Sequence, residues 1–294
     1  ILHATDFSPA ALRATNATRE LAQRTGAKVT LLTVFEPPSP NAAVDGRKAD
    51  DWLEVLRSDS FAGVDDVDIV ALPGPRPETV ICQEAAARNA DLIVVGRHGR
   101  HAVSERLLGT TSERVARHAP CSVWVTHAAQ QEHVVAFDHL LACSDLSEES
   151  RGAVALTGAL ARSFSAHVTL AHVYDIFPPV ELIARNYEED EIAQYGNLLQ
   201  TRLERLRAEL LPEVAGETRA LRDKSTVTAL CDYAGDHQVK MMVVGTNALT
   251  GMRRALIGSV AERVIRHAPC AVLVFRPSRV LKNSRRRHHR VHLS

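Results

Sequence analysis

The 294-residue chain lacks several features that would place it in common functional classes. Its formal net charge is zero and aromatic residues make up only 4% of it. Bulk charge therefore implies no partner, and there is no stacking platform for single-stranded nucleic acid. No apolar run approaches the length of a membrane-spanning helix, and no signal peptide is visible. We expect a cytoplasmic protein without a transmembrane segment.

Cysteine and catalytic motifs are equally sparse. The five cysteines stand singly, without a Cys-x-x-Cys pair, and the 14 histidines form no His-Glu-x-x-His motif. We expect reduced, mostly buried thiols, as in cytosolic proteins, and assign no metal ligands. A P-loop, a dinucleotide fingerprint and a nucleophile elbow are also absent, so no catalytic residue is assigned.

The chain contains an internal duplication. Residues Arg117–Val125 return as Arg266–Val274, 149 positions later, and Ala4–Ser8 return as Cys143–Ser147, 139 positions later. The second half therefore holds about ten extra residues in its middle, a spacing typical of tandem domains rather than of a solenoid. We predict one domain at residues 1–130, a second at 137–275, and a tail at 276–294.

Within each half, strand patterns alternate with helix patterns. Ser8 and Pro9 are a cap and first-turn pair, Gly26 ends that helix, and Ser147 is expected to cap the corresponding helix of the second half. Such alternation predicts an α/β fold with a parallel sheet covered on both faces. Strands are expected at 1–5, 28–35, 67–72, 92–95, 122–125, 139–143, 168–173, 218–221, 241–244 and 271–275, and helices at 50–58, 77–89 and 179–211, the last with an apolar stripe of Leu198, Leu199, Leu203, Leu206 and Leu210.

One stretch of the first half has the composition of an anion site. A buried strand ends at Gly96, a second glycine follows at Gly99, and Gly109 then opens a helix with three hydroxyl residues. Free backbone N–H groups and hydroxyls at a helix start favour phosphate. The alternative is a strand-to-helix turn and a capped helix without a ligand. The residues concerned, in the spacing Gly-x2-Gly-x9-Gly-Thr, are Gly96, Gly99, Gly109, Thr110, Thr111 and Ser112.

This spacing resembles the nucleotide motif of the universal stress protein family, G-x2-G-x9-G-(S/T), and both halves look like domains of that family. The resemblance implies two tandem Rossmann-like domains, each a five-stranded parallel sheet of order 3-2-1-4-5. It also implies an ATP-binding stress-response or signalling module with slow or no ATP hydrolysis. The alternatives are a nucleotide-independent interaction scaffold and, less favoured, an ATP-using enzyme on the same fold.

The resemblance also assigns site residues in the first half. Asp6 matches the aspartate near the adenine and ribose, where an Asx-type turn leading into the Ser8 cap is the alternative. His98 matches the loop under the phosphates, where a solvated loop histidine is the alternative. A divalent cation such as Mg²⁺ would bridge the phosphates. The assigned residues are Ala4, Thr5, Asp6, Val34, Val95, Gly96, His98, Gly99, Gly109, Thr110, Thr111 and Ser112.

The second half departs from the motif at Ala248, which stands where the second glycine should be. If that position needs a positive φ, a methyl group there costs roughly 1 kcal/mol or more, and if it needs only room, the methyl crowds the ligand. Nucleotide binding in the second half is left open, and we expect it to be weaker than in the first. The corresponding residues are Ser144, Asp145, Val173, Gly245, Ala248, Gly258 and Ser259.

The tail differs from the rest of the chain in composition. Residues 276–294 hold seven Lys and Arg residues and no Asp or Glu. They would contact a polyanion such as nucleic acid or anionic lipid, or else form a solvated disordered tail. As family dimers do, the two halves would pair through the edge strands 122–125 and 271–275 in an intramolecular pseudo-dimer. A homodimer of two chains is a further possibility.

Overall fold

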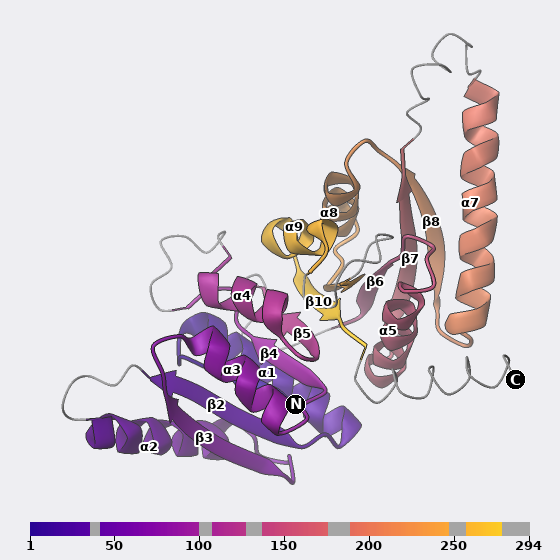
Figure 1. The fold of residues 1–294 in the computed structure, drawn as a ribbon. Helices are drawn as coiled ribbons and strands as arrows, with labels where there is room; N and C mark the ends of the chain where they lie inside the picture. Colours follow the sequence, from indigo (N-terminus) through magenta and orange to yellow (C-terminus); the bar gives the residue numbers. More distant parts are fainter. Residues whose placement is uncertain (36–41, 100–107, 128–136, 176–188, 247–256, 278–294) are drawn as a thin grey trace, which may run out of the picture. The chain divides into compact units, whose positions relative to one another are not determined.

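The computed structural model describes residues 1–35, 42–99, 108–127, 137–175, 189–246 and 257–277 (Figure 1). Internal contacts divide the chain into two compact units, one built chiefly from residues 1–135 and the other chiefly from residues 136–272. Ala248 and most of the tail predicted at 276–294 lie outside the described residues. No helix in the described part is long and apolar enough to cross a membrane.

The first unit holds five parallel strands in the order β3-β2-β1-β4-β5. Strand β1 lies at the centre, where Leu2 pairs with Thr30 on one side and with Ile93 on the other. This is the predicted order 3-2-1-4-5. The chain passes from β1 to β2 and β3 on one side and then returns to the other side of β1 at β4, so the strand order reverses between β1 and β4. The strands are β1 (Leu2–Ala4), β2 (Val29–Phe35), β3 (Val67–Pro73), β4 (Leu92–Val95) and β5 (Ser122–Val125).

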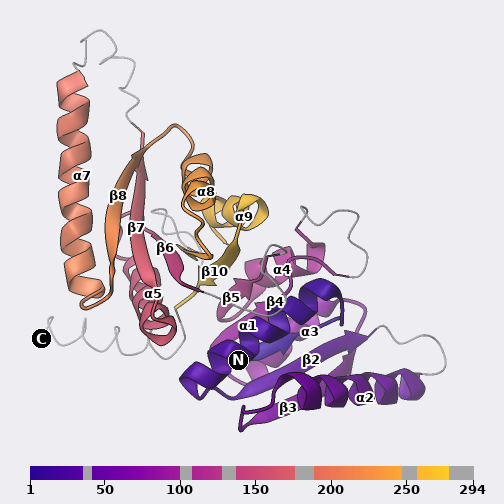
Figure 2. The same ribbon diagram turned by 180° about the vertical axis from the view of Figure 1, so that it is seen from behind.

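Four helices connect these strands and cover both faces of the sheet. Helix α1 (Pro9–Thr25) packs against α2 (Ala42–Ser60), and α3 (Pro77–Ala87) packs against α4 (Thr110–His118). The two views from opposite sides show α3 and α4 in front of the sheet in Figure 1 and α1 in front of it in Figure 2. Helix α2 is much longer than the predicted 50–58, because its pattern was obscured by the polar residues before Leu53.

The second unit repeats the architecture. Its strands lie in the order β8-β7-β6-β9-β10, the same order as in the first unit. Of the long helix expected at 179–211, the structure describes the part from Glu189. The elements are β6 (His139–Cys143), α5 (Arg151–Phe164), β7 (His167–Tyr174), α7 (Glu189–Leu210), β8 (Gly216–Arg222), α8 (Thr226–Asp236), β9 (Met241–Gly245), α9 (Ser259–His267) and β10 (Ala271–Phe275).

The first helices of the two units begin differently. Ser8 caps α1 as predicted: its Oγ accepts a hydrogen bond from the Ala11 N–H at 3.3 Å. The prediction that Ser147 caps the equivalent helix is wrong, because α5 begins only at Arg151. Ser147 instead accepts from the Ser150 N–H, at 3.2 Å, within a turn. The second half lacks a proline after this serine, so nothing fixes the backbone in helical geometry there.

Burial follows the expected pattern with one exception. The central strands are buried on both faces, as parallel sheets covered by helices require. On α7, however, Leu198 is 52% exposed, whereas Leu199, Leu203 and Leu206 are buried. The packed stripe is therefore narrower than predicted. All five cysteines are free thiols: Cys121 and Cys270 are buried and the other three are half-buried.

The Ser8 cap yields a test of local stability. Replacing Ser8 with Ala removes an acceptor from the first turn of α1, so we expect the free energy of unfolding to fall by about 1 kcal/mol. Ser163→Ala is the control, because that half-buried serine lies near the end of α5 and donates to the Ala159 carbonyl oxygen of the same helix at 3.2 Å instead of capping it. The control should change stability by less than about 0.5 kcal/mol in the same denaturant titration. Equal effects would mean that the Ser8 bond does not stabilise α1.

His3 makes stability depend on pH. It is fully buried in β1, with Nδ1 3.3 Å from the Val94 carbonyl oxygen and Nε2 2.9 Å from Thr15 Oγ1. Burial lowers the pKa of His3 to about 4, against a smaller opposing effect of the Val94 bond. The unfolded chain therefore binds a proton at His3 near pH 6.5, whereas the folded chain does so only near pH 4. As a result, the free energy of unfolding falls as the pH drops from 6.5 towards 4.

The expected loss from His3 between pH 7 and pH 5 is about 2 kcal/mol. Denaturant titrations at both pH values, on the native chain and on His3→Gln, would measure it. Because glutamine does not titrate, the pH dependence of the variant should be smaller by that amount. The same pH dependence in both proteins would show that His3 is protonated in the folded state.

Candidate functional site

The carboxyl end of β1 turns sharply into α1. The Phe7 N–H donates to Thr5 Oγ1 and the Ser8 N–H donates to Asp6 Oδ1, both at 3.0 Å. Phe7 has a φ of 60°, a conformation that an aromatic residue adopts only when its surroundings impose it. The Asx-type turn considered as the alternative for Asp6 is therefore present, and it engages one of the two carboxylate oxygens.

The other oxygen of Asp6 faces the loop after β4. A Cβ atom added to Gly99 would lie 2.5 Å from Asp6 Oδ2, a distance that no real side chain tolerates. The φ of Gly99 is outside the left-handed region. Of the two reasons proposed for glycine at this motif position, the need for positive φ is therefore wrong, and the need for room applies. What occupies that room is the carboxylate of Asp6.

Gly109 closes the loop. Its N–H donates to the Arg97 carbonyl oxygen at 2.8 Å, and its own carbonyl oxygen accepts the first bond of α4 from Glu113 at 3.0 Å. A Cβ atom at Gly109 would lie 3.1 Å from the Cα of His98. Residues from both ends of the motif thus lie side by side at the amino end of α4, where Thr110 is exposed and Thr111 half-buried.

Two predicted site residues fix the start of the loop through contacts with neighbouring segments. The buried Ser112 hydroxyl donates to the Gly96 carbonyl oxygen at 2.6 Å. A Cβ atom at Gly96 would lie 2.9 Å from the carbonyl carbon of Ala10, so the end of β4 and the start of α1 touch backbone to backbone. Among the remaining predicted residues, Val34 is half-buried, and Ala4, Thr5 and Val95 are buried.

Basic side chains lie in and around the loop after β4. His98 is buried, so its interpretation as a solvated loop histidine is wrong, and Arg97 beside it is only 4% exposed. Burial and the positive charges of Arg97, His98 and Arg13 lower the pKa of His127 to about 4. Sequence reasoning missed Arg13, Arg97 and His127, although Arg97 lies inside the motif. This concentration of positive groups favours an anion near the loop.

The second unit reproduces the turn and the cradle. The Leu146 N–H donates to Ser144 Oγ and the Ser147 N–H to Asp145 Oδ1, both at 3.0 Å, and Leu146 has a φ of 61°. The Gly258 N–H donates to the Thr246 carbonyl oxygen at 2.8 Å, and Ser259 begins α9. Val173 is half-buried on β7, and Ala248 lies outside the described residues.

The supports beneath the second loop differ, however. Ala261 stands where the first unit has Ser112, so the hydroxyl bond to the strand end is missing. A Cβ atom added to Gly245 would meet no heavy atom within 4 Å, in contrast to Gly96. Among the residues that the structure describes, no cluster of three His, Cys, Asp or Glu side chains could hold a metal ion.

Both halves of the chain are similar to known proteins. The sequence pattern of the universal stress protein family matches residues 1–127 and again residues 136–276. The chain belongs to the universal stress protein family. A universal stress protein of Thermus aquaticus is 36% identical over 132 residues, which make up 42% of this chain and 94% of that protein. One of Mycolicibacterium smegmatis is 29% identical over 194 residues, 65% of this chain and 64% of that protein.

Solved structures extend the likeness in fold to both domains. A universal stress protein of Archaeoglobus fulgidus matches with a TM-score of 0.68 at 18% identity, covering 94% of this chain and 97% of that one. A putative universal stress protein of Pseudomonas aeruginosa matches with a TM-score of 0.67 at 20% identity, covering 96% and 94%. This chain is thus a tandem member with two universal stress protein domains.

Because Gly96 and Gly245 have different surroundings, we predict that the two positions differ in how well they tolerate a methyl group. Gly96→Ala should lower the stability of the first domain by about 1–3 kcal/mol, because the α1 backbone cannot move away cheaply. Gly245→Ala is the matched control and should change stability by less than about 0.5 kcal/mol. Thermal melts followed by circular dichroism on both variants would compare them. An equally stable Gly96→Ala variant would show that α1 and β4 can separate at this point.

Proposed function

We propose that the first domain of this universal stress protein binds ATP at the loop between β4 and α4. The observation that carries the proposal is the meeting of the Asp6 carboxylate with Gly99, which itself lies beside Gly109, at the point where the strand order reverses. Crevices at such points are the usual ligand sites of doubly wound sheets. An acidic group beside a glycine-lined helix start suits a ligand with hydroxyl groups at one end and phosphates at the other.

The residues divide between the parts of the nucleotide. Asp6 Oδ2 would accept hydrogen bonds from the ribose hydroxyls. The loop from Gly96 through His98 to Gly99, with Gly109, Thr110 and Thr111, would hold the phosphates by backbone N–H groups and hydroxyls, with Ser112 bracing the loop through Gly96. Arg97 and the neighbouring basic groups would favour their negative charge. A Mg²⁺ ion would bridge the phosphate oxygens. The residues left to border the adenine are Ala4, Thr5, Val34 and Val95.

We further propose a stress-response or signalling module in the cytoplasm with slow or no ATP hydrolysis, because no residue has been identified that would activate the attacking water. The second domain, with Ala248 in place of glycine, would bind nucleotide more weakly through Ser144, Asp145, Val173, Gly245, Gly258 and Ser259. Pairing of the two domains through their edge strands, a homodimer, and contact of the basic tail with a polyanion remain predictions.

A specific observation favours the alternative, a nucleotide-independent scaffold. Asp6 and Ser112 already have structural partners, and Gly96 is required for backbone packing. The motif would then be maintained by folding alone. The two functions differ in what ATP does to the folded protein, because only a protein that binds the ligand is stabilised by it.

The chain offers its own control for the nucleotide prediction. Asp6→Asn and Asp145→Asn both keep the Oδ1 acceptor of the turn and remove the charge. If the first domain is the main site, Asp6→Asn should weaken ATP binding about ten- to a hundredfold, the value of hydrogen bonds to a charged acceptor, whereas Asp145→Asn should leave the tighter site unchanged. Calorimetric titration with Mg²⁺ and ATP measures both.

The outcomes separate the two functions. A shift in the melting temperature of the native chain with ATP, lost in Asp6→Asn only, supports the proposal. Equal loss in both aspartate variants would make the domains equivalent sites. No binding of ATP by the native chain would leave the scaffold as the function.

A further inference from the structure

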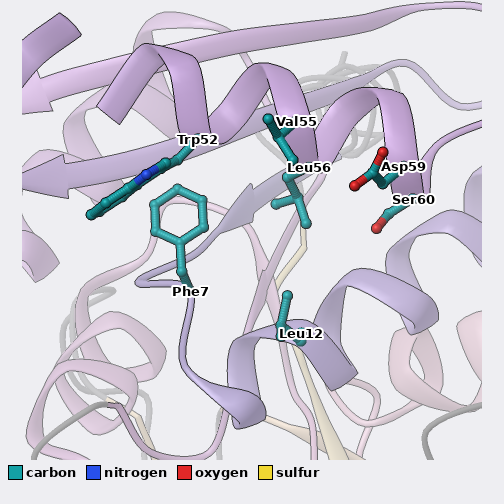
Figure 3. A pocket seen from close by; sticks show the side chains of 7 residues that line it. All are labelled: Phe7, Leu12, Trp52, Val55, Leu56, Asp59 and Ser60. Atoms are coloured by element: carbon teal, nitrogen blue, oxygen red, sulfur yellow. The ribbon is translucent and has the colours of Figure 1, made fainter. Parts of the chain in front are cut away.

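The first domain has a second recess, which shares Phe7 with the turn that carries Asp6. It is a groove of about 460 Å³ between α1 and α2. Its aromatic end is formed by Phe7 and Trp52, whose rings meet edge to face with centroids 5.5 Å apart. Figure 3 shows these rings at one end, with Asp59 and Ser60 at the other. A volume of this size lies within the range of small-molecule sites.

The walls between the two ends are aliphatic and open to solvent. Leu12 of α1 is 45% exposed, and on α2 Trp52 and Val55 are 51% and 57% exposed, whereas Leu56 forms the buried floor. Single exposed apolar residues are ordinary on protein surfaces. Leu12, Trp52 and Val55 line one hollow together with Phe7, and such a contiguous apolar patch is of the kind that marks binding sites.

The second domain shows that the fold does not need this patch. Helix α5 corresponds to α1 with a shift of 139 residues, since Thr18 and Thr157 make the same bond to the carbonyl oxygen four residues earlier, at 2.8 and 2.9 Å. The ends of α2 and α7 correspond with a shift of 150: Phe61 and Leu211 each donate to the carbonyl oxygen of an arginine four residues before, Arg57 and Arg207.

These shifts align four of the seven groove residues with charged residues of the second domain. Leu12 corresponds to Arg151 and Asp59 to Glu209, and in the second domain these two form an ion pair across the seam. Trp52 and Val55 correspond to two exposed arginines, Arg202 and Arg205. The same helix seam is thus charged and closed by an ion pair in one domain and apolar and open in the other. The fold accommodates both versions, so folding alone does not explain the apolar one.

The polar end of the groove indicates the charge of that ligand. Asp59 is the charged side chain among the lining residues, and in the described part of the chain it takes part in no ion pair. Its Oδ1 accepts a 3.3 Å bond from the Ser58 hydroxyl. Arg19 of α1 donates to the Ser60 carbonyl oxygen at 3.4 Å. The carboxylate therefore favours a cation and disfavours an anion at this end.

We propose that the groove binds a small amphiphilic amine, independently of the nucleotide site. Its apolar, preferably aromatic body lies against Trp52, Phe7, Leu12 and Val55, and its ammonium group reaches Asp59. The second domain, with arginines along the same seam, does not bind such a molecule.

Three probes with one carbon skeleton test the class of ligand: 4-phenylbutylamine, 4-phenylbutan-1-ol and 4-phenylbutanoate. Binding to the full chain is followed by the emission of Trp52, since the only other tryptophan, Trp124, is fully buried. Ligand-observed NMR provides an independent signal. The amine should bind about two- to fivefold more tightly than the alcohol, as expected for an exposed ion pair, and the carboxylate should bind more weakly than the alcohol.

Two variants assign the binding to the groove. Asp59→Asn should reduce the affinity for the amine to that for the alcohol and leave the alcohol unaffected. The double variant Leu12→Arg with Val55→Arg introduces the residues of the second domain at exposed positions, so the fold is expected to tolerate it. It should abolish binding of all three probes, and its circular dichroism spectrum and melting temperature would verify folding.

Several results would overturn the proposal. These are no saturable binding of the amine, equal binding of amine and carboxylate, or unchanged binding by the double arginine variant. Sedimentation tests whether a second copy of the chain occupies the groove instead. If the native chain is a dimer that the double variant converts to monomer, the groove is a contact between copies of the chain and not a ligand site. None of these results depends on whether ATP binds at the other loop.

Discussion

The candidate site of the first domain depends on one close approach, that of the Asp6 carboxylate to the backbone at Gly99. Asp6 lies at the end of the central strand and Gly99 in the loop after the neighbouring strand, so the approach brings together two segments more than ninety residues apart in sequence. Any side chain at Gly99 would displace the carboxylate. The Asx-type turn fixes the other oxygen of Asp6, so one carboxylate contacts both the turn into α1 and the loop after β4.

The two described ends of the loop after β4 are held by close contacts. The Gly96 backbone touches α1, the Ser112 hydroxyl bonds to Gly96, and the Gly109 N–H bonds to Arg97. These contacts fix the described ends of the loop, residues 96–99 and 108–109, before any ligand arrives, which would favour binding because less conformational entropy is lost. Buried basic groups add a field for anions. Rigidity and charge therefore come from the same few residues.

Duplication lets the two domains be compared under one fold. Both keep the turn and the cradle to within 0.1 Å in the shared hydrogen bonds, yet among the described residues the second lacks the bond of the Ser112 hydroxyl and the close backbone contact of Gly96. The helix seam differs in the opposite sense, since it is apolar in the first domain and charged in the second. Features that only one copy has are not required by the fold, so they are candidates for a function of that copy.

The sequence by itself determined the duplication, the alternation of strands and helices, and the motif positions, because periodicity and spacing are local. Its resemblance to the family supplied the strand order. Only the tertiary structure decided why Gly99 is glycine, that His98 is buried, that Leu198 faces solvent, and that Ser147 turns the chain instead of capping α5. Each of these depends on contacts between segments distant in sequence, or on a small balance between two local geometries. The groove between α1 and α2 is of the same kind, since its walls come from two helices whose residues look like ordinary surface positions until they are packed.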